Sequence, residues 1–353
     1  MVLAAGAAVQ VEVPAPPDGV LAAAVFDRDL DTGWRRTSYT GLTRAVHEHE
    51  AVGSEAQVPV KDDEPEPPVA GEADRDSPLR AVPSPMADLP GGAWFGTLVH
   101  AVLEEADLSG DDPRAALVEA CAEQLQHRTV DLSAEQLADA LLPAVSTPLG
   151  PLAGGRRFRD VAPADRLLEL SFELPLAGGD RPVADVRLGE VADLLEAHLP
   201  AGDRVRPYAR LLRDPLLAGQ QLRGYLSGSI DVVVRVDGPR FLVLDHKTNR
   251  LADRDVPLTA WHYRQEALDD AVLAAHYPLQ ALLYCVALHR FLRWRQPGYD
   301  PARHLGGVLY LFLRGMVGDA LPDDGAAPPG VWSWRPPAEL VTALSDLLAG
   351  RRP

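Results

Sequence analysis

The sequence contains no run of about eighteen apolar residues, so it predicts no membrane-spanning helix. Its opening residues, MVLAAGAAVQVEV, lack the basic start of a secretory signal, and acidic residues and prolines soon follow. Both absences favour a cytoplasmic protein. The apolar share of 46% and the charged share of 24% are ordinary for a globular protein, and 353 residues can bury one large core or two modest ones.

Cysteine is scarce as well. The chain has only Cys121 and Cys285, which lie far apart in apolar helical patterns, and we interpret them as buried reduced thiols. Two thiolates cannot supply the four ligands that an iron–sulfur cluster normally needs, so no cluster is expected. The chain also lacks a G-x-x-x-x-G-K-[ST] phosphate loop, so we expect no ATP site of that kind.

The net charge of −17 argues against tight binding of nucleic acid by this chain alone. Part of the charge is concentrated between His47 and Leu89, where eleven acidic and three basic residues give −8. Residues 47–90 are rich in Pro, Glu, Asp, Ala and Ser and show no apolar periodicity, which predicts an acidic disordered linker. If nucleic acid is the substrate, a partner or another domain would have to deliver it.

After this stretch the pattern becomes that of a globular domain. Helical spacing of apolar residues covers 93–107 and 114–127, and a capping box of Ser133 and Gln136 opens a helix over 133–142. A strand is predicted over 166–176, ended by Pro175, and another over 306–314. Further helices are expected near 188–198, 206–213, 278–295 and 339–350. This mixed order predicts an α/β or α+β fold.

The most informative stretch is a predicted hairpin, in which GSIDVVVRV (228–236) and FLVLDHK (241–247) flank the turn DGPR. Because strand side chains alternate between faces, Asp245 and Lys247 share one face, and Asp231 lies on the opposite face from Ile230 and Val232. A hairpin register that buries the apolar side chains of both strands would bring Asp231, Asp245 and Lys247 together at one edge of the hairpin.

These three residues suit hydrolysis of a phosphodiester. Buried carboxylates need a cation, and hard oxygen ligands favour Mg²⁺, which lowers the pKa of a bound water and neutralises developing charge. Lys247 would orient or help to deprotonate that water. The chain has only one other lysine, Lys61 in the predicted linker, so Lys247 is the sole lysine of the globular part. A solvated surface lysine is the alternative interpretation.

Spacing alone leaves four further polar residues unassigned. Glu169 stands in the middle of LLELSF and is equally consistent with an exposed edge residue. His100 lies on the flank of an amphipathic helix, where a structural histidine is the simpler interpretation. Gln280 and Tyr284 are four residues apart on one face of a strongly apolar helix.

The hairpin GSIDVVVRVDGPRFLVLDHKTNRL resembles the D…(D/E)-x-K core of the PD-(D/E)XK nuclease superfamily, and more narrowly the RecB-type nuclease domains of exodeoxyribonuclease V. The resemblance continues through HYPLQALLYCVALHRFLRWRQPGYDPARHLGGVLYLFLRGM, and WRRTSYTGLTR resembles the segment that joins helicase and nuclease parts in that family. It implies an α/β fold with a restriction-endonuclease-like core, in which helices flank a central mixed β-sheet, with extra N-terminal helices. The implied divisions are a remnant of the connecting segment at 1–46, the linker at 47–90 and the nuclease domain at 91–353.

The resemblance also implies roles by position. Asp231 and Asp245 match the family's metal-binding aspartates, and Lys247 matches its catalytic lysine. His100 falls on a helical histidine of the metal site, and Glu169 falls on a preceding catalytic glutamate. The pair of polar residues on the apolar helix matches a Q-x-x-x-Y motif associated with DNA contact: Gln280 and Tyr284. One departure is His246, where the family commonly has an aromatic residue; because it points to the opposite face, we expect little effect.

The implied function is that of a Mg²⁺-dependent deoxyribonuclease, which cleaves linear DNA in double-strand-break repair and recombination. RecC-like and RecD-like subunits are the implied partners and would feed it single-stranded DNA. Since the phosphate loop is absent, the chain is expected to be a fragment, a split gene product or a free-standing nuclease, and residues 26–46 favour a truncated subunit. The alternatives are a nuclease of defence or plasmid maintenance, and a catalytically decayed scaffold or DNA-binding module of the same fold.

Overall fold

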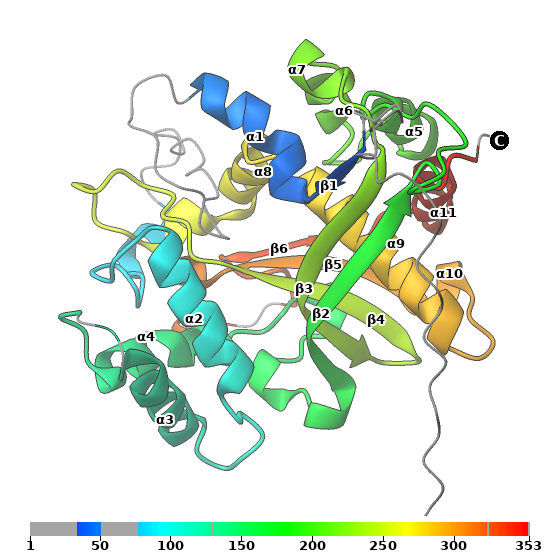
Figure 1. Cartoon of the computed structure of the whole chain (residues 1–353). Coiled ribbons are helices and arrows are strands. Elements are labelled where there is room, and N and C mark those ends of the chain that lie inside the picture. Colours follow the sequence, from blue (N-terminus) through cyan, green and yellow to red (C-terminus); the bar gives the residue numbers. More distant parts are fainter. Residues whose placement is uncertain (1–33, 51–76, 127, 129, 323–324, 352–353) are drawn as a thin grey trace, which may run out of the picture. The chain divides into compact units, whose positions relative to one another are not determined.

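A mixed β-sheet forms the centre of the protein (Figure 1). The computed structural model describes residues 34–50 and 77–351 apart from 127, 129, 323 and 324, and all of these lie in one unit, Gly33–Pro353. The sheet order is β1-β3-β4-β5-β6, and β2 pairs with β3 as well. The strands are β1 (Arg35–Thr37), β2 (Arg166–Leu176), β3 (Gly224–Val236), β4 (Arg240–Lys247), β5 (Leu305–Phe312) and β6 (Val331–Trp334).

Helices cover both faces of the sheet, and each face has its own apolar core. The first, which we call the α2 core, is covered by α2 (Ala93–Glu105), α3 (Pro113–Leu125) and α4 (Ala134–Ser146). The second, the α9 core, is built around the long buried helix α9 (Tyr277–Arg295). It also receives residues from α1 (Tyr39–Glu50), α5 (Glu190–His198), α6 (Tyr208–Leu211), α7 (Pro215–Ala218), α8 (Gln265–Ala274) and α11 (Ala338–Leu348). This α/β architecture confirms the predicted fold class.

The sheet forks along β3, and the fork determines where a cavity can open. On one side, β3 pairs with β2 along most of its length. On the other side, β4 pairs with Val232–Val236, the second half of β3, whereas β1 runs parallel to Gly224–Leu226 at its beginning. Residues 227–231 therefore have no strand partner on this side within the described part of the chain. Figure 1 shows the paired ribbon of β2 and β3 extending beyond the end of β4.

The segment before α2 corrects one of the predicted boundaries. Residues 77–90 have a defined structure that includes the 3₁₀ helix η1 (Pro78–Ala81), and Met86 is fully buried in the α2 core. The prediction of a disordered linker over 47–90 is therefore wrong for 77–90, and α1 also extends beyond residue 46 to Glu50. The remainder of that linker, 51–76, lies outside the described residues, as does most of the predicted connecting segment at 1–46.

The predicted elements agree with the structure except near a few ends. The long helix, both strands of the hairpin and the capping box of Ser133 and Gln136 are confirmed. Pro175 does not end its strand: it pairs with Tyr225 inside β2, which is an edge strand and so tolerates a residue that lacks an N–H. Not predicted were β1, α7, α8, α10 (Pro301–His304) and β6, which are short or lack a clear period.

No single described helix is both long and apolar enough to cross a membrane. Only α8 and α9 taken together meet the criteria of length and composition, and they are bent by 82° relative to each other. Most residues of α9 are buried against the sheet and its neighbouring helices.

Candidate active site

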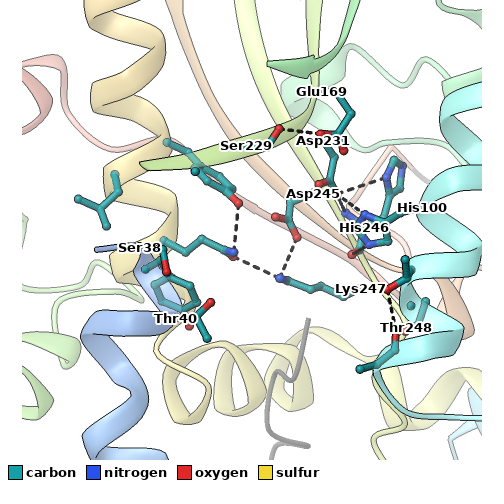
Figure 2. Close-up of a pocket in the computed structure, with 18 of the residues that line it drawn as sticks. Ser38, Thr40, His100, Glu169, Ser229, Asp231, Asp245, His246, Lys247 and Thr248 are labelled. Carbon is teal, nitrogen blue, oxygen red and sulfur yellow. Dashed lines mark hydrogen bonds and ion pairs between the residues drawn. The ribbon is translucent and has the colours of Figure 1, made fainter. Parts of the chain in front are cut away.

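A cavity of about 600 Å³ opens at the fork of the sheet (Figure 2). Ser227 to Ser229 and Asp231 line it from β3, and Asp245 to Asn249 line it from the end of β4. The start of α1 and the inner face of α2 form other parts of the wall. The structure brings all the predicted site residues to this one cavity: His100, Glu169, Asp231, Asp245, Lys247, Gln280 and Tyr284.

Asp231 is held between β4 and α2. Its Oδ2 accepts a hydrogen bond of 2.8 Å from the backbone N–H of His246 and lies 3.3 Å from Nδ1 of His100. The other ring nitrogen of His100, Nε2, lies 2.9 Å from the carbonyl oxygen of His246. Because a carbonyl only accepts, Nε2 carries the hydrogen in this contact, and a neutral ring then turns the lone pair of Nδ1 toward Asp231.

The environment of Asp231 favours its charged form. Burial would raise the pKa of this carboxyl, but the charge and hydrogen bond that His100 supplies when it is protonated, together with the hydrogen bond from His246, more than offset it. The pKa of Asp231 consequently lies well below its usual range. A neutral imidazole lone pair and a carboxylate oxygen 3.3 Å apart repel each other unless a proton or a cation lies between them.

Asp245 and Lys247 form the second group of the site. Both side chains are about 5% exposed or less, and Nζ of Lys247 lies 2.9 Å from Oδ2 of Asp245. Nζ also donates to Oε1 of Gln280 at 3.2 Å, and Nε2 of Gln280 donates to the hydroxyl of Tyr284 at 3.2 Å. The ammonium lies 4.2 Å from the ring centroid of Tyr277, which adds a cation–π contact. Lys247 is thus buried and firmly oriented, unlike a solvated surface lysine.

Glu169 reaches the cavity from the edge strand through an unusual backbone conformation. In the register of β2 and β3, Leu168 pairs with Val232 and Leu170 with Ile230, so Glu169 and Asp231 both lie between these two pairs. The φ of Glu169 is 49°, in the left-handed region, which is costly for a residue with a Cβ. Its carboxylate accepts a hydrogen bond of 2.8 Å from Oγ of Ser229 (Figure 2). In this structure Glu169 does not contact the two aspartates through any hydrogen bond or ion pair that we observe among the described residues.

Both strands change faces at this pair. Leu168 packs in the α2 core and Leu170 in the α9 core, although strict alternation would place them together. In β3, Val232 packs in the α2 core whereas Ile230 packs in the α9 core. The expectation that Ile230 and Val232 share a face is therefore wrong. The paired strands β2 and β3 therefore pass from the α2 core to the α9 core at Glu169 and Asp231. The irregular backbone at these two residues directs both carboxylates into the cavity.

His246 is the site residue that the sequence interpretation missed. Its ring is 4% exposed, Nδ1 lies 3.6 Å from Oδ2 of Asp231, and the ring makes edge contacts with His100 and Phe158. The expected orientation is confirmed, because the side chain points away from Asp245 and Lys247, but β3 brings Asp231 to the same side as His246. The expectation of little effect stays a prediction. The departure from the common aromatic residue at this position was the signal available in the sequence.

The donor set fits a divalent cation. Asp231 and Asp245 provide hard carboxylate oxygens, and His100 provides an imidazole nitrogen that faces Asp231. Among the described residues no three His, Cys, Asp or Glu side chains stand in a completed ligand cluster, and Asp245 is paired with Lys247. The residues that would hold the ion are thus Asp231, Asp245 and His100.

Comparison with known proteins shows to which superfamily the chain belongs. The sequence model of the PD-(D/E)XK nuclease superfamily matches residues 78–327, a range that contains all seven predicted site residues. The chain belongs to the PD-(D/E)XK nuclease superfamily. This agrees with the mixed sheet flanked by helices and with an aspartate followed two residues later by a lysine at the end of β4.

The individual proteins with similar sequences are RecB subunits. The chain is 51% identical to the RecBCD enzyme subunit RecB of Mycolicibacterium smegmatis over 344 residues, which cover 96% of this chain and 31% of that protein. It is 50% identical to RecB of Mycobacterium tuberculosis, with 97% and 31% covered, and 30% identical to RecB of Escherichia coli, with 90% and 23% covered. The chain therefore spans about a third or less of the length of these relatives.

Proposed function

We propose that this chain is the nuclease part of a RecBCD-type exodeoxyribonuclease V, which hydrolyses phosphodiester bonds of linear DNA with Mg²⁺ in the cytoplasm, in double-strand-break repair and recombination. The observation that carries the proposal is the convergence of Asp231, Asp245 and Lys247 in one cavity. Superfamily membership and the extended likeness to RecB subunits support it.

When bound, Mg²⁺ would supply the Lewis acidity that activates a water and offsets charge on the scissile phosphate. Asp231 and Asp245 would hold the ion as charged carboxylates. Lys247 donates hydrogen bonds to the oxygen on which negative charge develops, and its low exposure makes that interaction stronger than in water. Gln280 keeps the ammonium in place through a bond of 3.2 Å, so little reorganisation is needed during the reaction.

The charge of the cavity explains why the substrate would need to be delivered. Besides Asp231 and Asp245, Glu104 and Glu169 line the cavity, whereas Lys247 is the only Lys or Arg among the lining residues. Such a wall repels a phosphate backbone, in keeping with the net charge of −17. We propose that RecC-like and RecD-like subunits feed single-stranded DNA into this cavity, where the cation offsets the repulsion.

A nuclease assay on linear single-stranded and duplex DNA, with and without Mg²⁺, tests the proposal. Lys247→Ala should reduce the rate by about 10³-fold, because a donor to the transition state is lost, and Asp245→Asn should abolish Mg²⁺-dependent cleavage. Lys61→Ala, which alters the only other lysine, is the matched control and should cleave like the wild type. Persistent cleavage by both purified site variants would remove the proposed mechanism.

The role within a RecBCD-type enzyme needs a separate test. Co-purification of tagged chain with RecC-like and RecD-like subunits, followed by activity of the assembly, should give faster cleavage than the chain alone. A free-standing nuclease of defence or plasmid maintenance predicts full activity without those subunits. A decayed module predicts neither cleavage nor Mg²⁺ binding that depends on Asp231 and Asp245.

A further inference from the structure

Among the described residues, Arg314 has the second largest fully buried side chain. Its guanidinium donates hydrogen bonds to backbone carbonyls, including that of Thr248, which directly follows Lys247. Arg314 lies in the 3₁₀ helix η6 (Leu313–Gly315) directly after β5 and is 1% exposed. Its Nε donates to the carbonyl oxygen of Thr248 at 2.7 Å. Its two terminal nitrogens donate to carbonyl oxygens of the 77–90 segment, those of Met86, Leu89 and Pro90.

These carbonyls belong to two parts of the chain that flank the cavity. Thr248 follows Lys247 directly at the end of β4, and Pro90 lies two residues before Gly92, the N-cap of α2. The backbone of Arg314 is tied to the same segment, because Oγ of Ser84 donates to its carbonyl oxygen at 2.6 Å. The guanidinium carbon also lies 5.2 Å from the ring centroid of Phe95 in the first turn of α2. One side chain thus joins the end of β4 to the start of α2.

The spacing between these two elements matters for the site. The start of α2 packs closely on the residue after Lys247: a Cβ placed on Gly96 would lie 3.4 Å from Oγ1 of Thr248. One turn further along α2, His100 contacts Asp231 through Nδ1 and the carbonyl of His246 through Nε2. The position of His100 relative to the two strands therefore depends on how the start of α2 is fixed against Thr248.

We propose that Arg314 is a positioning residue of the metal site, which sets His100 on α2 against Asp231 and the end of β4. This inference rests on the proposed metal-dependent nuclease function. Arginine suits the task because its planar guanidinium presents five N–H donors in fixed directions. Neither lysine nor methionine can bind the same four carbonyls at once, so a substitution loosens the 77–90 segment and the start of α2 without touching a ligand.

The test compares two buried arginines in the full chain. Arg314→Met removes the link to the cavity, whereas Arg290→Met removes bonds of 3.0 and 2.7 Å to Oγ and the carbonyl oxygen of Ser345, which join α9 to α11 away from the cavity. Mg²⁺ is titrated by calorimetry without DNA, and hydrogen exchange is followed by mass spectrometry. Cleavage is measured over a range of Mg²⁺ concentrations. Asp231→Asn serves as the reference for lost binding.

For Arg314→Met we expect a Mg²⁺ dissociation constant about ten-fold higher, as for other residues that orient metal ligands, while kcat at saturating Mg²⁺ changes less. Amide exchange should rise in residues 77–93. Arg290→Met should lower the melting temperature but leave the dissociation constant unchanged. If Arg314→Met does not fold, Arg314→Lys is measured by the same criteria.

Two results are decisive. A wild-type dissociation constant in the folded Arg314 variant would overturn the positioning role, as would equal weakening in both arginine variants. If the wild type and Asp231→Asn show the same Mg²⁺ isotherm, the proposed function itself fails. The two failures are therefore distinguishable.

Discussion

The ammonium of Lys247 and the carboxylate of Asp245 form a buried ion pair of 2.9 Å between alternate residues of one strand. Breaking such a pair by removing one partner leaves an uncompensated buried charge. The same ammonium bonds to Gln280, so the geometry of Lys247 depends on α9 as well as on β4. This arrangement gives Gln280 and Tyr284 a function inside the protein, whereas their contact with DNA stays a prediction.

Variants of Gln280 separate these two roles. Gln280→Ala should reduce kcat about ten-fold and leave KM for DNA nearly unchanged, because Lys247 loses a fixed partner in a site where small displacements are costly. Tyr284→Phe removes the hydrogen bond between Tyr284 and Gln280 but leaves that between Gln280 and Lys247. It should therefore have a smaller effect on kcat. Steady-state kinetics on a single-stranded oligonucleotide would measure both, with Gln296→Ala at the other end of α9 as the control. A rise in KM with an unchanged kcat would instead support direct contact with DNA.

The backbone of Glu169 predicts a trade-off between stability and activity. Since its φ is 49°, glycine should be tolerated better than alanine: Glu169→Gly should exceed Glu169→Ala in free energy of unfolding by about 1 kcal/mol. Both variants should lose activity together with the carboxylate. Glu169→Gln retains an acceptor for Ser229 and should match the wild type in stability but not in cleavage. Denaturant titration and the nuclease assay measure the two properties, and equal stability of the glycine and alanine variants would contradict the role of strain.

His289 should make folding sensitive to acid. Burial, followed by the charges of Arg293 and Arg290, lowers the pKa of His289 to about 4, and its ring is 4% exposed. The unfolded chain binds a proton near pH 6.5 and the folded one only near pH 4, so this contribution is present above pH 6.5 and is lost as the pH falls toward 4. The loss amounts to at most about 3 kcal/mol. The free energy of unfolding, measured against pH over this range, should have different slopes for the wild type and for His289→Asn. Parallel curves would exclude the effect.

The two cysteines should be inert in the folded protein. Both are free and buried, as predicted, and burial raises the pKa of the Cys121 and Cys285 thiols to about 12. At pH 8 the reactive thiolate fraction is therefore on the order of 10⁻⁴. A chromogenic disulfide reagent should detect no thiols in the native chain and two after addition of guanidinium chloride. Rapid reaction of either thiol in the native state would show that its helix opens locally.

The sequence was most informative where local patterns and tertiary structure agree. The hairpin of β3 and β4, the long helix α9 and the convergence of Asp231, Asp245 and Lys247 followed from residue types and spacing. Simple alternation did not reveal how they converge, because it breaks where the ribbon changes cores at Glu169 and Asp231. For the same reason alternation alone did not predict the contact of His246 with Asp231, although the departure from the common aromatic residue marked that position.

The 77–90 segment shows a different limit. Its four prolines resemble those of a linker, and no local periodicity marks it as ordered. Its structure depends on carbonyl contacts with Arg314 and on a backbone bond from Ser84 to Leu258, residues more than 170 positions away. Order imposed by distant residues leaves no signature within the segment itself.

The parallel pairing of β1 with the beginning of β3 has a practical consequence for any shortened gene. The match to the superfamily begins at residue 78, so a chain cut there would omit Arg35–Thr37. The amides and carbonyls of Gly224–Leu226 would then form an open edge, which in other sheets recruits strands from neighbouring molecules. Such a truncated chain should self-associate, and adding residues 34–50 back as a separate peptide should suppress the self-association.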